Sequence, residues 1–242
     1  MLKYSPKLNL SIIVPAFNEE DGIKDTILTI FNDAKIPSIK KLLGKLEVIV
    51  VDDGSNDKTF DYAKDLTKRF KNLRIIKQKR NQGLGASIKT GILNSKNEFV
   101  TYLPADGQAF LREIGEGLKL ISSADLVLTY RGERTDYNSY RNILSNTLMI
   151  FMKILFNVNY KDYNWVHIYR KKVFKKVNVK SDGVFFLAEV VIRFENANLS
   201  ILEAKAKYNP RNTGFSKNAR IVVVLRTLTD LLKLWNELKL GL

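Results

Sequence analysis

The segment "LEVIVVDDGS" at residues 46–55 ends a run of mostly aliphatic residues with two adjacent aspartates and a Gly-Ser pair. The aliphatic residues are continuous rather than alternating, which is typical of a strand buried on both faces of a parallel sheet. Asp-Gly-Ser also has the composition of an ordinary turn. Two adjacent carboxylates nevertheless repel each other unless a ligand or a donor group uses them. The segment therefore predicts a buried strand with a candidate binding site at its carboxyl end.

The first 130 residues repeat this pattern. Short apolar runs that end in polar residues recur at 10–16, 73–78, 98–107 and 124–130. Stretches with helical spacing separate them, at about 21–34, 57–70, 84–95 and 110–122. Strands that alternate with helices imply βαβ units and a mostly parallel sheet. Such sheets bind ligands at the carboxyl ends of their strands, which is where Asn18–Glu19, Asp52–Asp53 and Asp106 fall.

Residues 131–242 follow a different pattern. Residues 139–158 predict a helix with a wide apolar face, and residues 185–197 predict a second helix between strand-like segments at 163–174 and 199–208. The tail predicts an amphipathic helix over 221–238, because its apolar residues fall on one helical stripe. That stripe consists of Ile221, Val224, Leu225, Leu228, Leu231, Leu232 and Trp235.

The composition excludes several classes of protein. The apolar content of 45% and charged content of 27% are those of a globular chain. The absence of cysteine excludes a disulfide framework, a thiolate metal site and a cysteine nucleophile, and fits a reducing compartment. We see no secretory signal, and the longest aliphatic runs, "LMIFM" and "IVVVL", are far shorter than a membrane span of roughly 18 residues. The sequence therefore predicts a cytoplasmic chain without a transmembrane span.

The charge is distributed unevenly. The net charge is +15, and residues 131–242 carry 20 Lys and Arg against 9 Asp and Glu. Residues 1–130 carry 20 against 16. This excess suits a polyanionic partner such as anionic lipid or a phosphorylated substrate, although a solubilising basic surface would have the same composition. We expect no nucleic acid partner, because no recognition motif accompanies the charge.

Two features that resemble functional motifs are weak. In "NQGLGASIKTG" (81–91), Gly83 and Gly85 are followed by Ile88 where a dinucleotide fingerprint has its third glycine. A phosphate contact and a tight turn that brings the helix close to the sheet remain equal alternatives there. His167 is the only histidine and lies in an apolar strand pattern, so we interpret it as structural. No G-x-S-x-G nucleophile elbow is present.

Together, the segments resemble the family-2 glycosyltransferases with the GT-A fold, and most of all their polyprenyl-phosphate branch, which is similar to dolichyl-phosphate-mannose synthase. The matching segments run from about residue 10 to 217: "SIIVPAFNEEDGI", "VIVVDDGSNDKT", "NQGLGASIKTGI", "FVTYLPADGQ", "TYRGERTDYNSYRNILSN", "DYNWVHIYR", "AEVVIRF" and "NPRNTGFSK". The resemblance implies an α/β fold with a Rossmann-like, mostly parallel sheet flanked by helices and followed by C-terminal amphipathic helices. It implies a GT-A domain over 1–218, divided into a nucleotide-sugar half (1–130) and an acceptor half (131–218), and a tail helix in 219–242.

By position, the resemblance also assigns donor-site residues. Those at the first two strand ends would hold the nucleotide sugar: Pro15, Phe17, Asn18, Glu19, Asp52 and Asp53. Asp106 would contact the donor and coordinate Mg²⁺ or Mn²⁺, with Gln108 as a second ligand. The chain departs from the family in "PAD", where Pro104 replaces the first of two usual acids. A divalent ion also takes oxygens from diphosphate and water, so one carboxylate can suffice, with weaker metal affinity.

On the acceptor side, the resemblance assigns Arg131, Arg141, Ser145 and Arg211 to a phosphate, and Asp106, Arg131 and Arg211 to catalysis. A phosphate oxygen is already ionised near neutral pH and needs no general base, whereas a sugar hydroxyl does. The excess of cations after residue 130 favours the phosphate, and no Q-x-x-R-W segment of processive synthases is present. Glu189 is a candidate base for a hydroxyl acceptor, or an ordinary helix carboxylate.

The expected function is inverting transfer of one sugar from a UDP- or GDP-sugar to a polyprenyl phosphate, dolichyl or undecaprenyl, in glycan biosynthesis at the cytoplasmic membrane face. We expect peripheral association with an anionic membrane surface through the helices at 143–156 and 221–238, which could instead pack on the core or contact a second copy or a membrane partner protein. Two alternatives stay open: a glycan hydroxyl acceptor, and a catalytically weak nucleotide-sugar-binding partner subunit, for which Pro104 is the best evidence.

Overall fold

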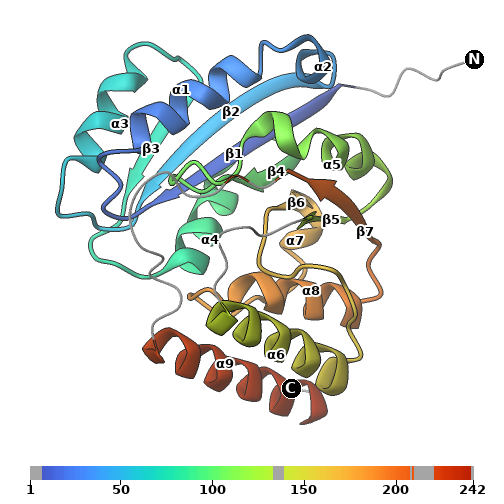
Figure 1. Cartoon of the computed structure of the whole chain (residues 1–242). Coiled ribbons are helices and arrows are strands. Elements are labelled where there is room, and N and C mark those ends of the chain that lie inside the picture. The colour runs from blue at the N-terminus through green and yellow to red at the C-terminus, as the bar shows by residue number, and fades with distance from the viewer. Residues whose placement is uncertain (1–6, 133–138, 208, 210–220, 241–242) are drawn as a thin grey trace, which may run out of the picture.

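The computed structural model describes residues 7–132, 139–207, 209 and 221–240, and contains one seven-stranded sheet (Figure 1). The strand order is β3-β2-β1-β4-β6-β5-β7. The strands are β1 (Leu8–Ala16), β2 (Leu43–Asp52), β3 (Leu73–Lys77), β4 (Phe99–Tyr102), β5 (Leu126–Arg131), β6 (His167–Arg170) and β7 (Ile201–Ala206). All pairs are parallel except those that β6 makes with β4 and β5. The predicted mostly parallel α/β sheet is confirmed.

Helices connect the strands and cover both faces of the sheet. The α-helices are α1 (Ile23–Asp33), α2 (Pro37–Lys40), α3 (Thr59–Thr67), α4 (Leu84–Asn94), α5 (Gly115–Leu120), α6 (Ser139–Phe156), α7 (Lys171–Phe174), α8 (Phe186–Asn196) and α9 (Ile221–Leu240). The 3₁₀ turns are η1 (Leu111–Ile114) and η2 (Ile121–Ser123). Every helix expected from spacing is present, whereas the single turn α2, which begins at a proline, is too short to leave a periodic signal.

The core consists of two layers, one on each face of the sheet. Alternate residues of β1 and β2 belong to different layers: Ile12 and Val50 face one, and Ile13 and Val51 face the other, all with no exposed surface. One layer lies under α1, α3 and α5, and the other under α4, α6, α8 and α9 (Figure 1). Burial on both faces explains why these strands are continuous aliphatic runs.

Two strands end earlier than the sequence pattern suggested. β2 ends at Asp52, where the chain turns through Gly54 with φ +74°. β4 ends at Tyr102, and the segment from Pro104 onward turns through Gly107 with φ +73°. Proline has no N–H for the sheet, and glycine accommodates the left-handed backbone. The candidate residues Asp53 and Asp106 therefore lie in turns beyond their strands.

His167 begins the antiparallel strand β6 and is fully buried, with its Nδ1 3.2 Å from the Tyr169 hydroxyl. Burial lowers the pKa of His167 from 6.5 to about 4, although the charge of Asp162 raises it slightly. This environment fits the structural interpretation of the residue, because a buried neutral imidazole at the centre of a sheet is part of the core.

We expect the free energy of unfolding to fall by roughly 3 kcal/mol from this residue as pH falls from 7 to 4. The unfolded histidine binds a proton near its ordinary pKa of 6.5, whereas the folded one resists it until about 4, so the stabilisation is complete above 6.5. Urea unfolding of wild type and His167→Gln at several pH values measures the free energy of unfolding against pH. The difference between the two proteins separates the effect of His167 from that of the carboxylates. Parallel pH profiles of the two proteins would contradict the assignment.

Candidate active site

The chain segments that follow β1 and β2 are hydrogen-bonded to each other. The backbone N–H of Asn18 donates to Ser55 Oγ (3.0 Å), and that of Glu19 donates to Thr59 Oγ1 (2.8 Å). In return, Asn18 Oδ1 accepts from the N–H of Asn56 (3.0 Å), with Asn18 itself at φ +52°. Pro15, Phe17 and Glu19 are half-buried along this seam. The structure thus brings the predicted donor residues of the two strand ends together.

Asp52 has a buried carboxylate oxygen that no described residue satisfies. The side chain has no exposed surface, and its Oδ1 accepts from the N–H of Ser55 at 3.2 Å. Its Oδ2 has no hydrogen-bond partner among the described residues. A buried unpaired carboxylate oxygen is costly, so a ligand N–H, such as the imide of a uracil or guanine base, would stabilise this position.

Both carboxylate oxygens of the adjacent Asp53 accept hydrogen bonds from the protein backbone. Its two oxygens accept from the N–H groups of Gln82 (2.8 Å) and Gly83 (2.9 Å). Burial raises the pKa of Asp53, with a further contribution from the charge of Asp52, and these N–H bonds oppose the rise. Asp53 therefore fixes the loop before α4, and its predicted contact with the donor stays a prediction.

The glycines of that loop serve close packing. Gly83 has φ +106°, and a Cβ there would lie 2.6 Å from the carbonyl oxygen of Asp182. A Cβ at Gly85 would lie 2.5 Å from Cβ of Phe186. Of the two alternatives for this motif, the structure therefore favours the tight turn that brings α4 against the segment 181–186.

Asp106 follows β4 at the same edge of the sheet. The segment is held by Leu103, whose N–H donates to the Ile13 carbonyl (2.9 Å), and by Thr26 Oγ1, which donates to the Ala105 carbonyl (2.9 Å). Asp106 is half-buried, and its Oδ1 accepts from the N–H of Gln108 at 3.2 Å. β1 lies between β2 and β4 in the sheet. Asp52 is the last residue of β2, and Asp106 lies in the turn that follows β4, on the other side of β1.

Arg131 forms a buried ion pair that the sequence did not suggest. Its Nε lies 2.7 Å from Asp162 Oδ2 and its Nη2 lies 3.1 Å from Oδ1, and only 5% and 3% of the two side chains is exposed. The guanidinium also lies over the Trp165 ring at 4.6 Å. Asp162 is thus the partner of a candidate site residue, and the sequence reasoning missed it, although "DYNW" was among the segments that carried the resemblance.

Glu189 is engaged on both carboxylate oxygens. It lies buried in α8, accepts from the N–H groups of Lys180 (2.9 Å) and Ser181 (2.7 Å), and pairs with Arg193 Nε at 2.6 Å. This set of partners favours the ordinary structural carboxylate over the candidate base.

The other acceptor-side residues are only partly described. Ser145 is half-buried on α6. Arg141 also belongs to α6, one turn before Ser145 as the spacing predicted. Arg211 lies outside the described residues.

A model of the family described as Glycosyl transferase family 2 matches residues 11–180, which run from β1 to the segment before α8. The chain belongs to glycosyl transferase family 2. The resemblance predicted from the motifs is therefore confirmed.

Several curated relatives are named for transfer to a lipid phosphate, the acceptor class of the predicted branch. A dolichyl-phosphate β-glucosyltransferase of Dictyostelium discoideum is 30% identical over 167 residues, 63% of this chain and 51% of the relative. One of Trichomonas vaginalis is 29% identical over 152 residues, 58% of this chain and 47% of the relative. The undecaprenyl-phosphate 4-deoxy-4-formamido-L-arabinose transferase of Pectobacterium atrosepticum is 24% identical over 225 residues, 90% of this chain and 67% of the relative. The chain spans about half the length of the dolichyl-phosphate relatives.

Solved structures with a similar fold match nearly all of the chain. Glucosyl-3-phosphoglycerate synthase from Mycobacterium tuberculosis, with Mn²⁺, UDP and its product, gives a TM-score of 0.71 at 15% identity and covers 93% of this chain and 79% of that one. Mannosyl-3-phosphoglycerate synthase from Rubrobacter xylanophilus gives 0.71 at 14% identity, with 95% and 75% covered. At such low identity the similarity establishes the fold, which is the predicted GT-A fold.

Proposed function

We propose that this family-2 chain transfers a sugar, with inversion at its anomeric carbon, from a UDP- or GDP-sugar to a polyprenyl phosphate at the cytoplasmic membrane face. The observation that carries the donor side is the buried Oδ2 of Asp52, which has no hydrogen-bond partner among the described residues and lies at the end of β2, with β1 between it and the β4 end near Asp106. A base N–H at Asp52 and a diphosphate at Asp106 would together span one nucleotide.

The acceptor class rests on charge and on the relatives. The relatives named above act, by their names, on dolichyl or undecaprenyl phosphate. A phosphate acceptor needs no general base, and Glu189, the candidate for one, is fully engaged by Arg193 and two backbone N–H groups. The excess of Lys and Arg in residues 131–242 supplies cations for an anionic nucleophile.

The residues at the β4 end fit a divalent cation shared with the donor. The Asp106 carboxylate and the Gln108 side-chain amide are the hard oxygen ligands that Mg²⁺ and Mn²⁺ prefer. The described residues contain no group of three or more acidic, His or Cys side chains that could hold a metal by themselves. The donor diphosphate would thus complete the coordination. In support, a structural neighbour was crystallised in complex with both Mn²⁺ and UDP. When bound, such an ion neutralises charge on the leaving diphosphate.

In the proposed reaction an oxygen of the acceptor phosphate attacks C1 of the sugar from the face opposite the diphosphate. The bond from C1 to the diphosphate oxygen breaks, and the nucleoside diphosphate leaves with the electron pair. The protein holds the acceptor phosphate and the donor diphosphate in line with C1. We propose that this is the role of Arg131, Arg141, Ser145 and Arg211.

The test is calorimetric titration with UDP- and GDP-sugars, with and without Mn²⁺ or Mg²⁺, followed by a transfer assay with the bound donor. A short polyprenyl phosphate is expected to accept the sugar, whereas the matching polyprenol, which lacks the phosphate, is expected not to. Transfer to the polyprenol or to a glycan alone would contradict the acceptor class. Failure of every donor to bind would contradict the function. Donor binding without transfer to any acceptor would favour the catalytically weak, nucleotide-sugar-binding partner subunit.

Arg211→Ala is expected to lower transfer to the lipid phosphate by about tenfold to a hundredfold while leaving donor affinity within about twofold, because it removes a charged hydrogen bond to the acceptor alone. The matched control is Arg69→Ala, an exposed arginine just after α3. If donor affinity and transfer fell equally, Arg211 would contact the donor rather than the acceptor.

A further inference from the structure

The chain leaves the last strand of the sheet beside the candidate site. β7 runs parallel to β5 and pairs Ala206 with Arg131, the last residue of β5. Both strands end at the edge of the sheet where the parallel strands β1, β2 and β4 also end. Asn209 lies three residues beyond the end of β7 and belongs to the described part of the chain. The segment after β7 therefore begins at the edge that carries Asp106.

Asn209 is hydrogen-bonded to the turn at residues 106–110, which we call the Asp106 turn. Its backbone N–H donates to the carbonyl oxygen of Gln108 (3.2 Å), and its Nδ2 donates to Glu113 Oε1 (2.6 Å). The N–H of Gln108 donates in turn to Asp106 Oδ1. A carboxylate only accepts hydrogen bonds, so the Asn209 amide must present its nitrogen to Glu113. Two hydrogen bonds thus join the segment after β7 to the Asp106 turn and the residue behind it.

Glu113 uses its two oxygens for two different segments. Oε2 accepts from the N–H of Phe110 at 3.0 Å, and the N–H of Glu113 donates to the Phe110 carbonyl at 3.1 Å, which caps η1. This cap needs only one oxygen, and the other contacts Asn209, 96 residues away in the chain. η1 is itself fixed, because Leu111 and Ile114 are buried in the core. Glu113 is therefore a firm attachment point for Asn209.

The position of Asn209 matters for the acceptor side of the proposed reaction. Arg211, which is proposed to act on the acceptor phosphate, follows Asn209 by two residues in the sequence. Two residues of chain span at most about 7 Å, so an anchored Asn209 limits how far this arginine can be from the Asp106 turn. Transfer needs both substrates in line, and a displacement of about 1 Å can lower its rate by about a hundredfold.

We propose that Glu113 is a positioning residue that, through Asn209, holds the segment after β7 against the Asp106 turn and so aligns the acceptor with the donor. The inference rests on the proposed function and adds to it, since neither residue is given a contact with donor, acceptor or metal. Loss of the link should lower transfer but not donor affinity, because Leu103 and Thr26 also hold the Asp106 turn.

The test removes the hydrogen bond between Glu113 and Asn209 and then reverses it. Asn209→Asp keeps the shape of the side chain but places a second carboxylate against Glu113, whereas Asn209→Ala removes the donor without adding charge. In Glu113→Gln/Asn209→Asp the glutamine nitrogen can donate to the aspartate while its oxygen still accepts from the N–H of Phe110. This double variant also has the net charge of wild type.

Transfer to a short polyprenyl phosphate in detergent is the first readout. Its kcat/KM is expected to fall by about tenfold or more in Asn209→Asp and Asn209→Ala, and to return to within about threefold of wild type in the double variant. Donor affinity, measured by calorimetric titration, is expected to stay within about twofold in all three variants. Thermal unfolding shows whether each variant is folded. A loss of transfer that the double variant does not recover would overturn the proposal.

Hydrogen exchange of the Asn209 amide tests the link without any substrate. This N–H donates to the Gln108 carbonyl. It is expected to exchange about tenfold faster in the two single variants, and at the wild-type rate in the double variant. An exchange rate that stays the same in the single variants would overturn the proposal, because Glu113 would then not fix Asn209.

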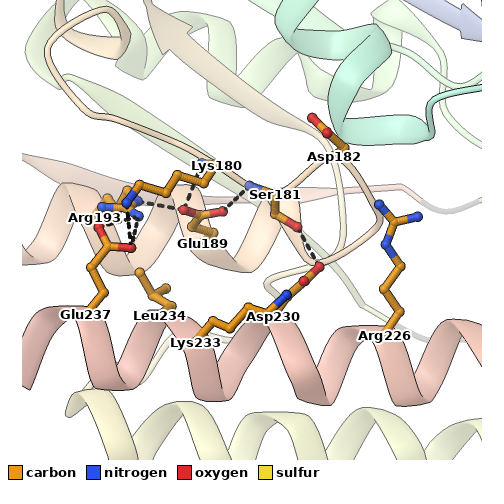
Figure 2. A pocket seen from close by; sticks show the side chains of 10 residues that line it. All are labelled: Lys180, Ser181, Asp182, Glu189, Arg193, Arg226, Asp230, Lys233, Leu234 and Glu237. Carbon is orange, nitrogen blue, oxygen red and sulfur yellow. Dashed lines mark hydrogen bonds and ion pairs between the residues drawn. The ribbon is translucent and has the colours of Figure 1, made fainter.

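Glu237→Gln is the matched control, because this carboxylate also joins two segments but lies outside the candidate site. Glu237 belongs to α9, which packs on the core through the buried Leu231. It pairs with Lys180 (3.0 Å) and Arg193 (3.1 Å) across a polar pocket between α8 and α9 (Figure 2). Neither α9 nor any other helix in the described ranges combines the length and apolar character needed to cross a bilayer. The control should transfer sugar as wild type does.

Failure of the proposed function gives a different set of results. A wild-type chain that transfers no sugar, while exchange of the Asn209 amide changes as expected, contradicts the proposed function and leaves the link in place. A wild type that transfers sugar as well as its Asn209 variants do overturns the positioning role alone. So would an equal loss of transfer in the Glu237→Gln control, or a fall of donor affinity as large as that of transfer, which would assign the pair to the donor.

Discussion

Asp106→Ala is expected to abolish metal-dependent binding of the nucleotide sugar and to lower sugar transfer by at least about a hundredfold. Asp106 is the only acid in "LPADGQ", and Gln108 offers a neutral amide that binds a divalent ion weakly by itself. The described residues contain no acidic cluster that could replace it. Calorimetric titration of the donor with and without Mn²⁺ measures the loss directly.

The control for this prediction is Asp65→Ala, which removes an exposed carboxylate on α3 that pairs with Lys68. Asp106→Asn keeps the shape of the side chain and removes its charge, so it should resemble Asp106→Ala in metal dependence. The stability of either variant should change little, since the half-buried side chain lies in a turn, where it accepts from the N–H of Gln108. Metal-dependent binding that survives in both variants would remove Asp106 from the metal role.

Pro104→Asp tests the same site in the opposite direction. It supplies the first of the two acids that the resemblance leads us to expect, and an added carboxylate raises the affinity of a divalent ion site through its charge. Pro104 is half-buried just beyond β4, where no sheet hydrogen bond depends on it. We expect tighter Mn²⁺ binding with donor present. An unchanged metal affinity would mean that position 104 does not reach the ion.

The parallel half of the sheet could be predicted because its signal is local. Val48, Ile49, Val50 and Val51 are all fully buried, and a short, continuous, β-branched run of this kind is typical of a strand that is covered on both faces. The antiparallel insertion of β6 between β4 and β5 had no such signal. Its pattern "WVHIY" predicts a strand, but its neighbours and direction depend on contacts about 40 to 70 residues away in the chain.

The candidate site was predicted at the level of strand ends but not of single atoms. Asp52 and Asp53 are adjacent in sequence, yet one oxygen of Asp52 has no partner among the residues that the structure describes, and Asp53 is held by Gln82 and Gly83. Asp52 is the last residue of β2 and Asp53 begins the turn that follows, so adjacency in the sequence could not tell which acid meets a ligand. Asp162, the partner of Arg131, lies 31 residues away, and the sequence holds no local sign of that pairing.

Asp162→Ala is expected to lower the free energy of unfolding by about 3–5 kcal/mol, because it removes the carboxylate that pairs with the buried Arg131 guanidinium. The two side chains are 5% and 3% exposed, and two nitrogens of Arg131 contact the two oxygens of Asp162. Urea unfolding of Asp162→Ala beside Asp65→Ala, from an exposed pair, measures the difference. Removing the exposed carboxylate should cost at most about 1 kcal/mol. Equal losses would mean that the buried pair does not anchor this region.

The double variant Arg131→Met/Asp162→Leu separates the structural part of this pair from its functional part. With both charges replaced by apolar side chains of similar size, no buried charge is stranded, so most of the lost stability should return. Sugar transfer should not return if the Arg131 guanidinium also contacts a phosphate, because the cation is absent from the double variant. Recovery of stability together with transfer would assign Arg131 to the fold alone. Recovery of stability without transfer is the result we expect.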